Sequence, residues 1–118
     1  MSGGASLAER IETIESGYEF MLAYAAQGRE DDQSGGAGPR IRDVLAGVEA
    51  ALDGLAPTVR ADAGSFRAVV EEDAAKARAA VQFVLAQARI SSQLVDNLNA
   101  SIHLRALLTD LFLLDAAR

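Results

Sequence analysis

Apolar side chains recur at intervals of three and four residues along most of this chain. The spacing matches the 3.6-residue period of an α-helix and places the apolar groups on one face. Val, Ile and Thr nowhere cluster in alternating runs, so no segment has the pattern of a β-strand. Alanine and leucine, which form helices readily, supply much of the apolar content. The sequence therefore predicts an all-α fold.

Helix boundaries are marked by capping residues. Ser6 and Glu9 form a capping box, in which each side chain accepts a hydrogen bond from the other's backbone N–H. Gly28 suits the position just after a helix, where the backbone becomes left-handed. The predicted helices cover residues 7–27, 41–55, 66–91 and 94–114. We predict a compact, up-and-down four-helix bundle. Residues 57–65 leave open a short helical connector, which would make five helices.

The last predicted helix does not have one continuous apolar face. Leu94, Leu98 and Ile102 form one stripe, and the leucines from Leu104 onward form another. At 100° per residue the two stripes do not coincide. Either the apolar face rotates or the helix breaks near residues 99–101, where Asn and Ser are weak helix formers and good caps.

A length of 118 residues suits one domain with one core, so we predict a single domain spanning residues 1–118. Residues 29–38 are polar, charged and rich in glycine. They have almost no apolar side chain to anchor them, so we predict a flexible loop there.

Charge and composition exclude several function classes. The net charge is −6 and the arginines are scattered, so the basic stripe of a nucleic-acid or membrane-surface binder is missing. There is no cysteine, and no apolar run approaches the 18 residues of a membrane span. The N-terminus lacks the pattern of a secretory signal. We expect no nucleic acid, no membrane, no cofactor and a cytoplasmic location.

His103 is the only histidine, and a continuous helix would place Asp96 and Asp110 on the same side. Imidazole with carboxylates is a metal-binding combination. We favour a solvated polar face, because one histidine is thin for a transition-metal site and the helix has a candidate break before it.

Asp73 falls within the apolar stripe of the third predicted helix. A buried carboxylate there would need a partner. Arg10 and Arg67 are the candidates that we consider for that role.

The C-terminal helix carries apolar groups on nearly every side. One helix of a small bundle meets its neighbours with only part of its surface, so the remainder predicts an interface. The expected interface residues are Leu104, Leu107, Leu108, Leu111, Phe112 and Leu114, with Phe20 from the first helix.

No catalytic motif is present, so we interpret the chain as a non-enzymatic interaction protein. We expect a homodimer, or docking on an unidentified protein partner. The alternative is a helical bundle that binds a metal or small ligand through His103 and nearby carboxylates.

Overall fold

The computed structural model describes residues 5–33 and 40–117, and within them it contains five α-helices, two short 3₁₀ turns and no strand. The all-α bundle predicted from the sequence is confirmed. Within the same residues no helix combines the length and apolar character needed to cross a membrane. In chain order the elements are α1 (Leu7–Ala25), α2 (Ile41–Leu52), η1 (Ala56–Thr58), η2 (Ala61–Ala63), α3 (Phe66–Leu85), α4 (Ser92–Ala100) and α5 (Ile102–Ala116).

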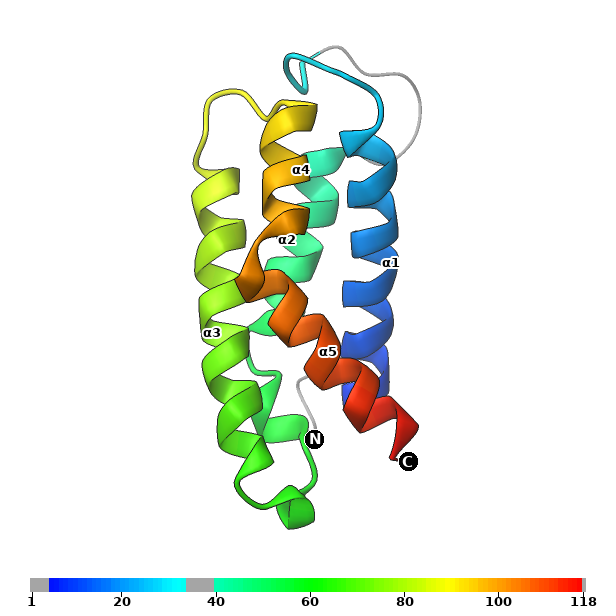
Figure 1. The fold of residues 1–118 in the computed structure, drawn as a ribbon, viewed down its shortest axis with the longest axis vertical. Coiled ribbons are helices and arrows are strands. Elements are labelled where there is room, and N and C mark those ends of the chain that lie inside the picture. The colour runs from blue at the N-terminus through cyan, green and yellow to red at the C-terminus, as the bar shows by residue number, and fades with distance from the viewer. Residues whose placement is uncertain (1–4, 34–39, 118) are drawn as a thin grey trace.

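The helices α1, α2, α3 and α4 alternate in direction along the long axis of the molecule (Figure 1). α1, α2 and α3 each occupy one of the four positions of the bundle, and α4 and α5 together occupy the fourth. α4 packs mainly against α1, whereas α5 packs mainly against α3. In Figure 1 α5 crosses the front of the bundle obliquely instead of continuing along the direction of α4.

The first helix begins at its predicted cap and ends at Ala25, two residues before the predicted end at residue 27. The Ser6 N–H donates to Glu9 Oε1 at 2.8 Å, and the Glu9 N–H donates to Ser6 Oγ at 3.2 Å. Gly28, just beyond the helix, has a φ of +66°. α3 was predicted to end near residue 91, but it ends at Leu85. The chain leaves the helix there, and Ile90 is completely buried in the segment that follows.

The predicted break in the last helix is confirmed at Ser101. Its backbone is extended, with φ −64° and ψ 141°, so it cannot continue α4. Ser101 N–H still donates to the Leu98 carbonyl at 3.1 Å, and its Oγ accepts from the Leu104 N–H at 3.3 Å. One residue therefore caps both helices. Ile102 does not extend the stripe of Leu98, because the chain changes direction and leaves Ile102 exposed.

α1 and α2 meet closely at a glycine. Gly17 is buried in the middle of α1, and a Cβ built there would overlap Val48 Cγ2 and lie 3.6 Å from Val44 Cγ1. Val48 is fully buried, and its branched side chain has few rotamers available in a helix. The contact between α1 and α2 therefore depends on the missing side chain.

Replacing Gly17 by Ala should lower the free energy of unfolding by ~1–3 kcal/mol, because the methyl group overpacks the contact with Val48. Gly47 is the matched control, since it lies inside α2 with no atom near its Cβ position. Gly47→Ala should raise stability by ~0.5–1 kcal/mol through helix propensity alone. Urea unfolding measures both. A stabilising Gly17→Ala would contradict the close approach.

Candidate functional site

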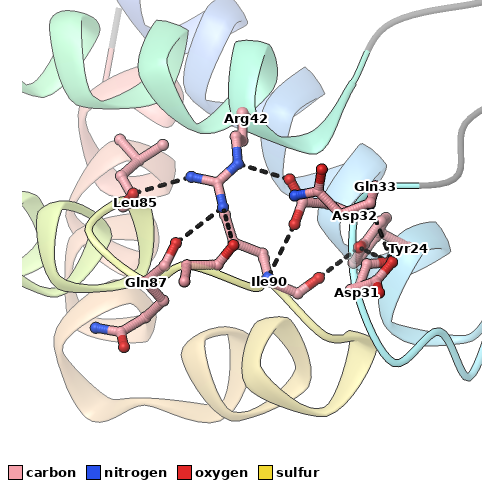
Figure 2. Close-up of polar contacts among 9 residues, drawn as sticks. Tyr24, Asp31, Asp32, Gln33, Arg42, Leu85, Gln87 and Ile90 are labelled. Carbon is pink, nitrogen blue, oxygen red and sulfur yellow. Dashed lines mark hydrogen bonds and ion pairs between the residues drawn. The ribbon is translucent and has the colours of Figure 1, made fainter.

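The largest polar network of the described residues surrounds Arg42, in the first turn of α2 (Figure 2). Its guanidinium donates to the carbonyl oxygens of Leu85 at 3.1 Å, Gln87 at 2.8 Å and Ala88 at 3.2 Å. Its Nε also donates to Asp32 Oδ2 at 2.6 Å. The carbonyls at the end of α3 have no partner within the helix, and Arg42 supplies one.

Asp32 is the buried anion of this network. Its side chain is 7% exposed, and its second oxygen accepts from the Ile90 N–H at 3.0 Å. Burial by itself raises the pKa of Asp32, but the hydrogen bonds from Arg42 and Ile90 outweigh it, and the pKa lies below its ordinary value. Asp32 is therefore held as a carboxylate with both oxygens occupied.

Tyr24 and Ser92 continue the network toward α1 and α4. Tyr24 OH donates to the Ile90 carbonyl at 2.6 Å (Figure 2). Ser92 Oγ donates to the Tyr24 carbonyl at 2.7 Å and accepts from the Arg29 N–H at 2.8 Å. The Arg29 guanidinium also lies 5.2 Å from the centre of the Tyr24 ring. These groups satisfy one another, so we assign the network a structural role.

The network includes the first part of the predicted flexible loop. In residues 29–33, the Arg29 N–H donates to Ser92 on α4, and Asp32 accepts from Arg42 on α2 and from the Ile90 N–H between α3 and α4. The prediction considered only apolar anchors. The rest of the predicted loop, residues 34–38, lies outside the residues that the structure describes.

A pair of carboxyl groups lies between α3 and α5. Asp110 is 6% exposed, and its Oδ2 is buried with no hydrogen-bond partner. The ionisable group that acts on it is Asp73, which is half-buried on α3. Burial is the main cause that raises the pKa of Asp110, and the hydrogen bond with Asp73 and the charge of Asp73 add to it, so that the pKa reaches about 7.

The partner expected for Asp73 was wrong. Arg10 donates to backbone carbonyls at the end of α2 and beyond it, including that of Asp53 at 2.8 Å. Arg67 donates to the carbonyls of Ala56 and Pro57. Both guanidinium groups cap the backbone, so Asp73 meets a second carboxyl group instead of a cation.

The residues considered for a metal site do not come together. Asp96 is exposed on α4, His103 is exposed on α5, and Asp110 is buried against α3. The break at Ser101 separates Asp96 from the other two. In residues 5–33 and 40–117 no three His, Asp or Glu side chains converge in a way that could hold a metal ion.

The expected interface residues fall into two groups. Four leucines of α5 are buried in the core of this chain, so in this fold they are not available to a partner: Leu104, Leu107, Leu108 and Leu111. Leu114 and Phe20 are partly buried against that core. Phe112 is exposed at 55%. The inner face of α5 is therefore part of the core of this chain.

The outer face of α5 carries two exposed large apolar side chains with small residues between them. Ile102 and Leu113 are 75% and 56% exposed, and Ala106 and Thr109 lie between them. The steps are four, three and four residues, which keeps all four side chains on one face. We call these four residues the outer seam. Beside it, Phe112 borders a groove between α5 and α1 that is also lined by Leu22.

The outer seam and the Arg42 network were not predicted from the sequence, for different reasons. The seam is visible in the spacing, but only once the inward face of α5 is known. Arg42 acts mainly on backbone carbonyls, which carry no sequence signal. Comparison with known proteins adds no assignment, because no protein-family model, curated protein or solved structure matches this chain.

Replacing Arg42 by Ala should lower the free energy of unfolding by about 2–3 kcal/mol, because Asp32 becomes a buried charge without its cation. Arg42→Lys should recover only part of this loss, since one ammonium group cannot reach four acceptors in a plane. Arg40→Ala, at an exposed side chain nearby, is the control and should change little. Equal effects at positions 40 and 42 would rule out the proposed role of the network.

Proposed function

We propose that this chain is a non-enzymatic helical-bundle protein that self-associates as a homodimer through the outer face of α5. The observation that carries the proposal is the outer seam, in which two large apolar side chains, Ile102 and Leu113, are exposed on a helix whose opposite face is already buried. Contiguous exposed apolar surface on a small protein usually marks an interface. We retain a cytoplasmic location as part of the proposal, on the sequence alone.

A second copy fits the seam because the seam is self-complementary. Its residues are large, small, small and large in order: Ile102, Ala106, Thr109 and Leu113. A two-fold axis at its midpoint would pair two α5 helices in opposite directions. Ile102 would then lie opposite Leu113 of the second copy, and Ala106 opposite Thr109. A two-fold dimer requires one patch that matches itself.

The neighbouring edge of α1 supports the same assignment. Phe112 and Leu22, which is 48% exposed, border one groove with Tyr18 and Leu108. At 1.5 Å per residue the seam is about 16 Å long. Stable dimers bury about 1,200–2,000 Å² in total, and the groove edge widens the apolar face toward that size.

Sedimentation velocity over a range of protein concentrations tests the proposal. We expect a dimer that dissociates on dilution, and a monomer for Ile102→Glu, which would bury a charge opposite Leu113. A glutamate in the first turn of α5 also interacts favourably with the helix dipole, so the monomer should remain folded. Phe83→Glu removes an apolar side chain of similar exposure from α3 and should remain dimeric. A wild-type monomer at high micromolar concentration would disprove self-association.

The register of the dimer can be tested separately, because the chain has no cysteine of its own. Ala106→Cys and Thr109→Cys single variants, mixed under mild oxidation, should form a disulfide between the two chains. Each variant alone should cross-link much less, since position 106 would face position 109. Efficient cross-linking of either variant alone, with none in the mixture, would exclude this register.

A further inference from the structure

The buried carboxyl pair offers a second inference, about how α5 is held in the bundle. We propose that a proton bound between Asp73 and Asp110 fastens α5 to α3, and that its loss at mildly alkaline pH loosens α5 specifically. The inference concerns packing within one chain, so it goes beyond the proposed dimer and holds whether or not the chain self-associates.

The geometry supports a shared proton. Asp110 lies on α5, which packs mainly against α3, and its side chain is almost completely buried, with one oxygen that no described group satisfies. Two adjacent carboxylates repel each other, but a protonated carboxyl can donate to a carboxylate. With one proton present the pair becomes a hydrogen bond between α3 and α5. Without it, two negative charges face each other at a buried contact.

The other charged groups around α5 do not neutralise this pair. Asp73 is the ionisable group that acts on Asp110. On the 100° helical wheel, the groove toward α1 lies on the opposite flank of α5 from Asp110. Arg60 and Asp62 pair with each other at 2.6 Å, beside the C-terminal end of α5. The groove contains Glu15 and Glu19, and α4 carries exposed Asp96. On α5 itself the other charged or titratable side chains are those of His103, Arg105 and Asp115, and all three are exposed.

The direction of the pH effect follows from linkage. Because the pKa of Asp110 is raised from 3.8 to about 7, the folded protein binds a proton that the unfolded chain releases between these values. Stability is therefore greatest near the acidic end of this window and falls as pH rises through it. Asp32 behaves in the opposite way, and its contribution is lost only as pH falls toward the acidic range.

Urea unfolding between pH 4.5 and pH 8.5, at concentrations where one species sediments, tests the inference. The unfolding equilibrium constant of the wild type should rise on the order of a hundredfold across this range. Asp110→Asn should flatten that rise and be more stable than the wild type at pH 8.5. Asp96→Asn and His103→Gln are controls and should keep the wild-type profile. An unchanged profile in Asp110→Asn would overturn the proposal.

Two measurements on the wild type keep the test independent of whether the variant folds. Carboxyl ¹³C NMR should show Asp110 titrating near neutral pH, and an ordinary midpoint near 4 would refute the shared proton. Amide hydrogen exchange should show α5 losing protection between pH 5.5 and pH 8.5 while α1 keeps it. Equal loss in both helices would mean that the effect is global and not at the α3–α5 contact.

Discussion

Ser101 ends α4 and begins α5, and most of the distinctive features of this bundle depend on that single residue. Its amide completes the last turn of α4, and its hydroxyl caps the first turn of α5. Because the chain turns here, α4 can pack on α1 while α5 packs on α3. A continuous helix could not do both. The turn also leaves Ile102 exposed and Asp110 buried.

The polar clusters around Asp32 and around Asp110 show how the neighbours of a buried carboxyl group determine whether it is ionised. A buried charge is stable only when nearby groups compensate it. Asp32 meets a guanidinium group and a backbone N–H, so burial costs little and the ionised form is retained. Asp110 meets another carboxyl group, so the neutral form is favoured. The contact made by Asp32 therefore stays ionised, whereas the contact made by Asp110 depends on pH.

The sequence predicted what local spacing and capping determine. The capping box at Ser6, the glycine after α1 and the break near Ser101 are all confirmed, because each acts within a few residues. It did not predict the end of α3 at Leu85, since Arg42 binds those carbonyls from 43 or more residues away. It also did not pair Asp73 with Asp110. A spacing pattern shows that a carboxylate lies on an apolar face, but not what it meets there.

The hydrogen bonds around Tyr24 have a consequence for the order of folding. They join segments 58 to 68 residues apart: Asp32 with Ile90, Arg29 with Ser92, and Tyr24 with both Ile90 and Ser92. Closing so long a loop costs more entropy than forming neighbouring helices, and non-local contacts slow folding. The neighbouring helices should therefore assemble first, and this end of the bundle should close last.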